Sequence, residues 1–231
     1  MVELGNARDV RSLSAAFRRR RDRLLRQFIE FRRSGHSGTF RIVDLGGTID
    51  YWRRVGFQWL KTNDITVYCV NHIVDEFGNS RNDDIPVKCI QGDACDMIDH
   101  ADFSFDLVHS NSVIEHVGRW SDMRRFAREV RRLAPAYYVQ TPYFWFPIDP
   151  HYYRMPFFHW MPESVRLKAH RRVKLGWPSP EPEIDDAMRL VTSSNMLDGA
   201  QFRTLFPDAR HSFERLALLP KSMIAIRGFG A

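Results

Sequence analysis

Short apolar runs alternate with amphipathic segments along most of this chain. From Phe40 onward the runs are rich in β-branched and aromatic residues, which is the composition of buried strands. Segments between them carry apolar residues three and four positions apart, the spacing of one helix face. Strand–helix alternation predicts a parallel sheet with helices on both faces. The predicted strands are 40–45, 65–71, 86–91, 105–110 and 136–141, and the predicted helices are 49–60 and 119–133.

The two ends of the chain depart from this alternation. Residues 8–33 carry apolar residues at helical spacing with arginines between them, which predicts one long basic helix. Near the other end, two strands at 213–219 and 222–227 are joined through Pro220-Lys221. A connection that short predicts an antiparallel hairpin, because a parallel return needs a dozen or more residues. We therefore expect a basic N-terminal helix over 1–38 and one domain over 39–231.

A segment of unusual composition, 142–182, lies between the fifth strand and the hairpin. Residues 142–162 contain nine aromatic residues, five prolines and two histidines. Prolines at this density exclude long regular elements, so the pattern predicts a stiff aromatic insert.

Charge is concentrated at the N-terminal end of the chain. The net charge is +6, and residues 1–35 hold ten arginines against four acids, so the remaining 196 residues are neutral overall. The run from Arg18 to Arg21 would suit an anionic polymer. The alternative is a solvated helix face that covers one side of the core, and the sequence leaves both readings open.

The cysteines and the apolar pattern bear on the compartment. Cys69, Cys89 and Cys95 form neither a disulfide framework nor a paired CxxC metal motif. Cys69 and Cys89 fall within predicted strands, where we expect buried, inert thiols. No apolar run approaches the ~18 residues of a membrane span, and Met1 to Asp9 lack the apolar region of a signal peptide. The expectation is a cytoplasmic protein without a membrane span.

A glycine turn follows the first predicted strand, in the run Asp44-Leu45-Gly46-Gly47-Thr48. Glycines let the backbone approach a ligand closely, and the following helix start offers free N–H groups, so the pattern favours a nucleotide-type cofactor. A dinucleotide site would need G-x-G-x-x-G and an acid about 20 residues later. Here a third glycine is missing and the second strand ends in Asn71, which disfavours nicotinamide.

Further motifs follow at regular spacing. Gly92-Asp93-Ala94 comes after the third strand, Phe105 to Val117 spans the fourth strand and its continuation, and Glu129 to Pro135 leads into the fifth. With the glycine turn, these motifs resemble those of class I S-adenosylmethionine (SAM)-dependent methyltransferases over about residues 40–141. The final hairpin is similar to the family's sixth and seventh strands. The resemblance implies a Rossmann-like sheet of seven mostly parallel strands with a C-terminal antiparallel hairpin and helices on both faces.

The resemblance also implies a set of SAM-binding residues. Asn71 stands where the family usually has an acid for the ribose hydroxyls; its amide oxygen can still accept a hydrogen bond, without charge assistance. Thr48 replaces a family glycine. The candidate cofactor residues are Asp44, Gly46, Gly47, Asn71, His72, Asp93, Ala94, Ser110 and Asn111.

Methyl transfer to a hydroxyl requires exclusion of water and a base that takes the proton. His116, next to Glu115 and just after the fourth strand, is the first candidate base, because histidine titrates near neutral pH. His151, in the insert, is the second. A packing role for His116 remains the alternative. Asp149 and His151 provide too few ligands to assign a metal, so a magnesium ion is left open.

The aromatic insert is where this family usually builds the acceptor lid, and aromatic faces stack on sugar rings. Packing of the irregular segment is the alternative for about half of these side chains. The expected substrate-side residues are Tyr143, Phe144, Trp145, Tyr152, His159 and Trp160.

The fourth-strand motif also bears on the acceptor. Amine-modifying nucleic-acid methyltransferases carry (N/D)-P-P-(Y/F) where this chain reads Asn111-Ser112-Val113-Ile114. A hydroxyl of a sugar, an oligosaccharide or another small molecule is therefore the expected acceptor. The chain is similar to bacterial sugar methyltransferases, such as the mycobacterial sugar 1-O-methyltransferases of methylmannose polysaccharide synthesis. Two alternatives remain, an RNA methyltransferase that uses the basic helix and a non-catalytic SAM-binding protein. The sequence does not choose between a monomer and a homodimer.

Overall fold

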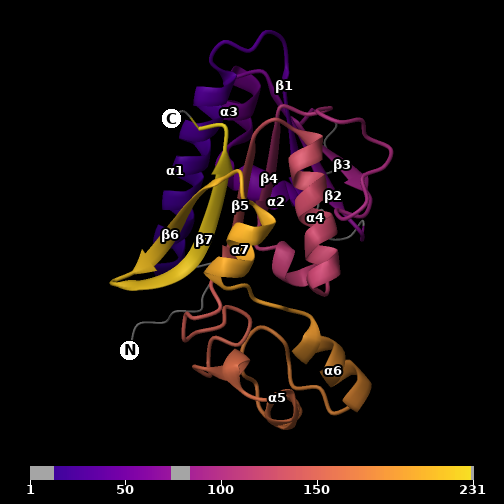
Figure 1. Ribbon diagram of the computed structural model, residues 1–231, viewed down its shortest axis with the longest axis vertical. Coiled ribbons are helices and arrows are strands. Elements are labelled where there is room, and N and C mark those ends of the chain that lie inside the picture. The colour runs from indigo at the N-terminus through magenta and orange to yellow at the C-terminus, as the bar shows by residue number, and fades with distance from the viewer. Residues whose placement is uncertain (1–12, 74–83, 230–231) are drawn as a thin grey trace.

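The computed structural model describes residues 13–73 and 84–229, in which helices and strands alternate largely as predicted (Figure 1). The predicted helix over 8–33 is described from Leu13, and its first residues lie outside the described part of the chain. In chain order the elements are α1 Leu13–Arg33, β1 Phe40–Leu45, α2 Ile49–Val55, α3 Phe57–Thr62, β2 Ile65–Asn71, β3 Val87–Gln91, β4 Leu107–Asn111, η2 Ile114–His116, α4 Trp120–Leu133, β5 Tyr137–Pro142, η3 Phe158–Trp160, α5 Glu163–His170, α6 Ile184–Thr192, α7 Gly199–Leu205, β6 Arg210–Leu216 and β7 Leu219–Arg227.

The described strands form a seven-stranded sheet in the order β3-β2-β1-β4-β5-β7-β6. Strands β1 to β5 pair in parallel, whereas β7 is antiparallel to both β5 and β6. The predicted fold class is therefore confirmed, including the C-terminal hairpin. The carboxyl ends of β1, β4 and β5 meet at one edge of the sheet, where ligands bind in open α/β folds.

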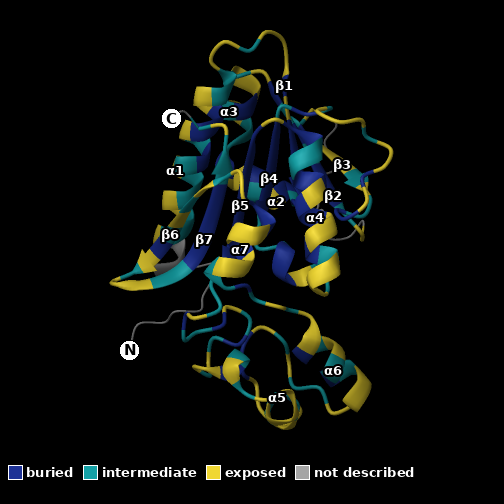
Figure 2. Cartoon of the chain, in the orientation of Figure 1, coloured by how far each residue is buried: buried dark blue, intermediate teal, exposed yellow. Residues whose placement is uncertain are grey.

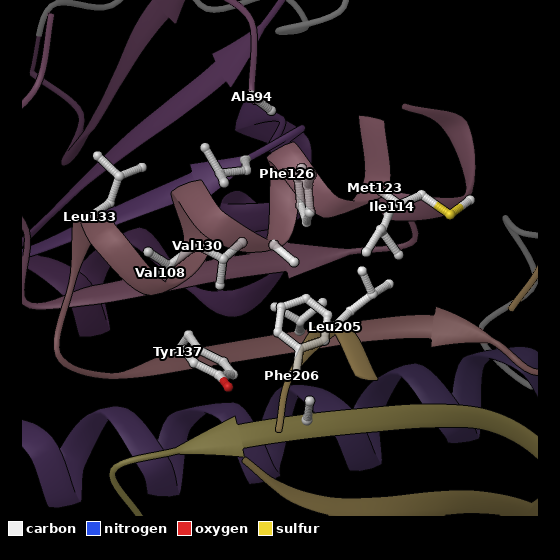
Figure 3. Packing of buried hydrophobic residues seen from close by; sticks show 14 of the residues in the cluster. Ala94, Val108, Ile114, Met123, Phe126, Val130, Leu133, Tyr137, Leu205 and Phe206 are labelled. Carbon is white, nitrogen blue, oxygen red and sulfur yellow. The ribbon is translucent and has the colours of Figure 1, made fainter. Parts of the chain in front are cut away.

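Helices cover both faces of the sheet. On one face, Phe28 of α1 and Trp52 of α2 pack with Ile42 and Leu107 of the strands. On the other face, α4 and α7 pack against β4 and β5; this cluster includes Val108, Phe126, Leu133, Tyr137 and Leu205 (Figure 3). Figure 2 shows the sheet as a buried layer beneath helices whose outer faces are exposed. Each large apolar side chain that is buried contributes about 1.5–3 kcal/mol to stability. Because α1 buries Phe28 against the sheet, this helix is part of the core.

The prediction of a single helix over 49–60 is wrong. Gly56 ends α2 with φ +122° and starts α3 immediately afterwards. A side chain there would adopt a strained backbone, and its Cβ would lie 2.7 Å from Nη2 of Arg26. Gly56 thus lets the chain change direction under α1.

The position of the hairpin turn also differs from the prediction. β6 ends at Leu216 and β7 begins at Leu219, so the turn lies at Ala217-Leu218, with Ala217 at φ +53°. Pro220 and Lys221, predicted as the connection, belong to β7. Pro220 is tolerated because it stands near the start of the strand, opposite an irregularity at Glu214/Arg215.

Two further expectations need correction or extension. Cys69 is buried as expected, but Cys89 is exposed because β3 is an edge strand. The insert holds the two-turn helix α5 and a small hydrophobic cluster of Tyr152, Phe158 and Leu175. Helices α6 and α7 had no counterpart among the predicted elements.

Among the described residues, none of the helices combines the length and the apolar character needed to cross a lipid bilayer.

Candidate active site

The candidate residues gather at the carboxyl edge of the sheet. Figure 1 shows that the insert, with α5 and α6, projects beyond this edge, below the ends of β5 and β7 in the view. The insert begins directly at the end of β5, and Leu197, after α6, bridges back to Tyr143. The edge and the insert together therefore form the region of interest.

The glycine turn after β1 is closely packed from both sides. Gly46 has φ +78°, and a Cβ there would lie 2.3 Å from Cγ2 of Val113. A Cβ on Gly47 would lie 2.2 Å from Oδ2 of Asp44. The turn therefore requires glycine at both positions, and its exposed side keeps the close backbone approach that a nucleotide-type ligand uses.

Asp44 lies beneath this turn and is buried. Its Oδ2 accepts a hydrogen bond of 2.7 Å from Nε1 of Trp52, and its Oδ1 lies 2.7 Å from Nδ1 of His109. Nε2 of His109 in turn lies 3.2 Å from the hydroxyl of Tyr51. Both carboxylate oxygens are thus engaged within the protein, and Asp44 holds the turn from below. Thr48 caps α2 by accepting a hydrogen bond from the backbone N–H of Tyr51.

Asn71 connects the end of β2 to the same turn. Its Nδ2 donates a 2.6 Å hydrogen bond to the carbonyl oxygen of Gly47. Because the amide nitrogen is used in this way, the amide oxygen is the group presented as an acceptor. Asn71 thus fixes the turn through its nitrogen and leaves its amide oxygen as an acceptor.

The motif after β3 presents a second acceptor. Oδ1 of Asp93 accepts a 2.7 Å hydrogen bond from the backbone N–H of Cys95, which fixes the turn. Nε2 of the exposed His72 lies 3.6 Å from that oxygen. Ala94 is buried and packs in the core. Asp93 and His72 therefore lie close together at the carboxyl ends of β2 and β3.

The end of β4 involves a residue that sequence reasoning missed. Ser110 is buried and donates to the carbonyl of Leu45, so it joins β4 to the glycine turn. Oδ1 of Asn111 accepts a 2.9 Å hydrogen bond from Arg21 of α1, whose Nε is 3.4 Å from Glu214. Arg21 was part of the arginine run, and nothing in helical periodicity indicated that it would turn inward to the sheet edge.

The predicted catalytic residues lie together. Glu115 and His116 follow β4 in η2, and His151 comes from the insert, yet Nε2 of His116 and Nε2 of His151 are 3.0 Å apart. One ligand atom from each of these three residues lies within 4.8 Å of the others. Glu115 is fully buried, and Thr141 at the end of β5 donates a 2.9 Å hydrogen bond to its Oε2. We call Glu115, His116 and His151 the edge cluster.

Each imidazole of the edge cluster is oriented by an acceptor on its other nitrogen. Nδ1 of His151 lies 2.8 Å from Oδ1 of Asp149, and Nδ1 of His116 lies 2.9 Å from the carbonyl oxygen of Ser193. Burial lowers the pKa of His151, but the hydrogen bond and the negative charge of Asp149 outweigh this effect, so the pKa of His151 is raised. Burial raises the pKa of Glu115, although the two histidines oppose the shift. The spacing Asp149-Pro150-His151 was the available sequence signal for this orienting pair.

The aromatic residues of the insert divide into two groups. Tyr152 is buried against Phe158, and Tyr143 packs on the core cluster, as the packing alternative expected. The carbonyl oxygen of Phe144 accepts hydrogen bonds from His159 and Trp160, each 2.8 Å long. Trp145 and Trp160 are 57% and 38% exposed, with ring centroids 5.9 Å apart. Of the predicted substrate-side residues, these two tryptophans are the exposed ones, and Phe144 lies beside Trp145.

Comparisons with known proteins bear on this arrangement. Residues 46–135 match the Methyltransf_11 family, described as a methyltransferase domain. The comparison with curated proteins found no match.

Solved structures share the fold at low identity. A SAM-dependent methyltransferase from Archaeoglobus fulgidus is 11% identical, with a TM-score of 0.52 and coverage of 91% of this chain and 93% of that one. A structure from Rhodobacter sphaeroides that is described as a Zn-dependent alcohol dehydrogenase is 14% identical, with a TM-score of 0.54. The match covers 84% of this chain and 86% of that one. A Galdieria sulphuraria structure described as a sarcosine dimethylglycine methyltransferase is 13% identical, with a TM-score of 0.50 and coverage of 84% and 64%.

These comparisons do not confirm the closer resemblance to the mycobacterial sugar 1-O-methyltransferases. The comparisons therefore show a match to a methyltransferase-domain family over residues 46–135 and a Rossmann-like fold shared with a solved SAM-dependent methyltransferase.

Proposed function

We propose that this protein is a SAM-dependent O-methyltransferase that transfers a methyl group to a hydroxyl of a sugar, a glycan or another small molecule. The observation that carries the proposal is the edge cluster, which lies just beyond the proposed SAM site. Glu115 and His116 follow Asn111 closely along the chain, and Thr141, the partner of Glu115, is adjacent to Gln140, which pairs with Asn111. In this proposal the edge cluster lies beside the methyl acceptor.

The proposed SAM site fits the groups that are present. The turn at Gly46 and Gly47 has no side chain to obstruct a ligand, and the Asn71 oxygen would accept from a ribose hydroxyl. Asp93 would accept from the adenine amine through Oδ2, since its Oδ1 is used by Cys95. His72, Ala94, Ser110 and Asn111 would complete the site, with Asp44 as the support beneath the turn.

The reaction requires the acceptor oxygen to lose a proton as it attacks the methyl carbon. The sulfur–carbon bond breaks, and S-adenosylhomocysteine leaves with the electron pair. An alcohol does not ionise at neutral pH, so the proton must pass to a neighbouring group, and general-base assistance is typically worth 10²- to 10⁴-fold in rate. In the proposed function the edge cluster provides that assistance, with His116 and His151 as the proton-accepting side chains.

The insert supports a sugar or another ring-shaped acceptor. Exposed tryptophan rings stack on the apolar faces of such molecules while hydroxyls remain available for hydrogen bonds. The contacts of α1 give less support to RNA, because several of its arginines bind within the chain. Arg21 contacts Asn111, Arg26 lies over Trp59 and Arg33 binds backbone carbonyls.

Calorimetric titration with SAM and S-adenosylhomocysteine tests the first half of the proposal. We expect micromolar binding that weakens about tenfold in Asp93→Asn, which keeps the Oδ1 contact but replaces the acceptor Oδ2 with an amide. Asp96→Asn, at an exposed neighbouring position, is the matched control. Absence of binding to both ligands would overturn the proposal and favour a scaffold protein.

Transfer from methyl-labelled SAM to a panel of sugars, glycosides and phenols tests the second half. His116→Ala should keep SAM affinity and lower turnover on the order of 100-fold. Label that appears on RNA or on amines, and on none of the hydroxyl compounds, would contradict the assignment of an oxygen acceptor.

A further inference from the structure

We propose that Glu115, His116 and His151 bind one divalent transition-metal ion through the Glu115 carboxylate and the two histidine Nε2 atoms. Binding of the ion is independent of any reaction, whereas its use in activating a hydroxyl rests on the proposed function.

The tautomers of the two histidines place two lone pairs against each other. The carbonyl of Ser193 is an acceptor only, so Nδ1 of His116 must carry the hydrogen in their 2.9 Å contact. The carboxylate of Asp149 likewise requires a hydrogen on Nδ1 of His151. When both imidazoles are neutral, both Nε2 atoms are therefore bare, and they face each other across 3.0 Å. Two acceptors at that distance repel unless a positive charge lies between them.

Glu115 supplies a third ligand. The side chain is fully buried, and its Oε1 is without a hydrogen-bond partner among the described residues. A buried carboxylate oxygen without a partner is costly. A cation held by this carboxylate and by the imidazoles would satisfy the oxygen and remove the repulsion between the lone pairs. A proton shared by the two Nε2 atoms would relieve only their repulsion, whereas one metal ion would also give the Glu115 oxygen a partner.

The distances suit a transition metal. Two imidazole nitrogens, each about 2.1 Å from one ion, lie about 3.0–3.4 Å apart at cis angles. The observed separation of 3.0 Å is within this range, and all three ligand atoms lie within 4.8 Å of one another. Two nitrogens and one carboxylate are donors for zinc, iron, cobalt, nickel or manganese, whereas magnesium prefers oxygen ligands. The donor set therefore does not support the magnesium ion that the sequence left open.

The groups behind the ligands match those of metal centres. A metal-bound histidine almost always donates its other N–H to a carboxylate or a backbone carbonyl, and ligating carboxylates are themselves hydrogen-bonded. Asp149, the carbonyl of Ser193 and the hydroxyl of Thr141 fill these three roles. The backbone of His151 is also fixed, because Gly176 packs so closely that its Cβ would lie 1.9 Å from the His151 carbonyl oxygen.

The ion would also provide a binding position for the acceptor hydroxyl at the exposed side of His116. Three protein ligands leave open positions for a hydroxyl, and coordination lowers the pKa of a bound hydroxyl so that its proton can pass to solvent. The oxygen would then attack the methyl group of SAM. In this form His116 and His151 act as metal ligands in place of the proton-accepting role described above, and solvent takes the proton.

Metal titration of the full-length protein tests the inference without reference to activity. After dialysis against a chelator, the protein is titrated with Zn²⁺, Co²⁺ and Mg²⁺, and bound metal is counted by elemental analysis. We expect one Zn²⁺ or Co²⁺ per chain, visible absorption bands of histidine-bound Co²⁺ and no competition by millimolar Mg²⁺. His151→Ala should weaken binding at least 100-fold, and Glu115→Gln at least tenfold.

Two further variants separate the site from general effects. His36→Ala removes a histidine outside the cluster and should bind one ion with unchanged affinity. Asp149→Asn keeps all three ligands and should weaken binding by 10- to 100-fold, because it alters the orientation and basicity of His151. Thermal unfolding of each metal-free variant identifies any that fails to fold, and the conservative Glu115→Gln and Asp149→Asn then carry the test.

The inference is overturned if the wild-type chain binds no stoichiometric metal, or if His151→Ala and wild type bind it equally. Methyl transfer that persists in chelator would remove the ion from the reaction and leave the proposed function intact. One ion per chain without SAM binding would keep the metal site and remove the proposed function.

Discussion

Asn71 donates a 2.6 Å hydrogen bond from its side-chain amide to the carbonyl oxygen of Gly47, and so ties the end of β2 to the glycine turn after β1. The geometry gives Asn71 two tasks, since the nitrogen fixes the turn and the oxygen remains for a ligand. An aspartate at this position would have no hydrogen to donate to the Gly47 carbonyl when it is ionised.

Replacement of Asn71 by alanine should therefore weaken SAM binding by about 10-fold. The loss combines one hydrogen bond to the ligand, worth about 1 kcal/mol, with a less rigid turn. Calorimetry with SAM measures the change, and Asn63→Ala, outside the proposed SAM site, serves as the control. Equal affinities of wild type and Asn71→Ala would exclude Asn71 from the SAM site.

Gly46 provides a test of packing in the turn. Gly46→Ala should destabilise the fold by more than about 2 kcal/mol and abolish SAM binding, because the new methyl group would overlap Val113. Gly38→Ala is a matched control, since Gly38 has a similar φ of +81° but nothing within 4 Å of its Cβ. It should cost only the backbone strain of about 1 kcal/mol.

The difference between these two glycine variants isolates the contact with Val113, and urea denaturation measures it. The double variant Gly46→Ala/Val113→Ala should recover part of the lost stability. Equal destabilisation by Gly46→Ala and Gly38→Ala would show that backbone strain alone makes glycine necessary in the turn.

The buried network under the turn should be sensitive to loss of one donor. Trp52→Phe leaves Oδ2 of Asp44 without its hydrogen bond and should lower the free energy of unfolding by about 1–3 kcal/mol. Trp59→Phe, in which the lost bond goes to the exposed Glu30, should cost less than about 1 kcal/mol. Urea denaturation measures the free energy of unfolding of both variants. Equal losses in the two variants would contradict a special role of the buried Trp52–Asp44 hydrogen bond.

The sheet could be predicted because each buried strand is a short apolar run and the motifs follow those strands in a fixed order. The break between α2 and α3 could not be predicted, because the apolar spacing continues through Gly56. Only the backbone conformation at Gly56 interrupts the helix. The hairpin turn was misplaced for a related reason. Pro220 signals a turn by its chemistry, yet the left-handed conformation belongs to Ala217, whose sequence gives no such signal.

The edge cluster was predicted residue by residue but not as a unit. His116 and His151 lie 35 positions apart, and the insert that brings them together has no periodicity from which its path could be inferred. The contact of Arg21 with Asn111 spans 90 positions and depends on the packing of α1 across the sheet. Local patterns thus singled out these side chains one by one, whereas their contacts depend on long-range packing.

Asp208 should make stability depend on acid pH. Burial opposes its charge, but hydrogen bonds from Tyr137 and Arg227 outweigh it and lower the pKa of Asp208. A lowered pKa means that the carboxylate stabilises the fold above its unfolded pKa of about 3.9, and that this contribution is lost as pH falls through the folded value. Since the side chain is 37% exposed, Asp208→Asn should cost less than about 1 kcal/mol at pH 7.

The cost of Asp208→Asn should shrink as pH falls below about 4, where the wild-type carboxylate is itself protonated. Urea denaturation midpoints measured from pH 7 to pH 3 give the difference in stability between wild type and Asp208→Asn at each pH. Asp96→Asn, at an exposed position, is the control and should stay close to wild type throughout. A stability difference that stayed constant with pH would mean that packing, rather than the charge of Asp208, stabilises its contact with Tyr137 and Arg227.

The exposed tryptophans of the insert should affect the acceptor and leave SAM binding unchanged. Trp145→Ala removes a ring that is 57% exposed and lies beside Trp160. Loss of one stacking contact, worth about 0.5–1.5 kcal/mol, should raise the acceptor KM by about 2- to 10-fold. Trp177→Ala is a well-matched control, because Trp177 is equally exposed and packs edge-on against Tyr153. A parallel loss of SAM affinity in Trp145→Ala would indicate that Trp145 supports the fold of the site, since a ring that only stacks on the acceptor has no contact with the cofactor.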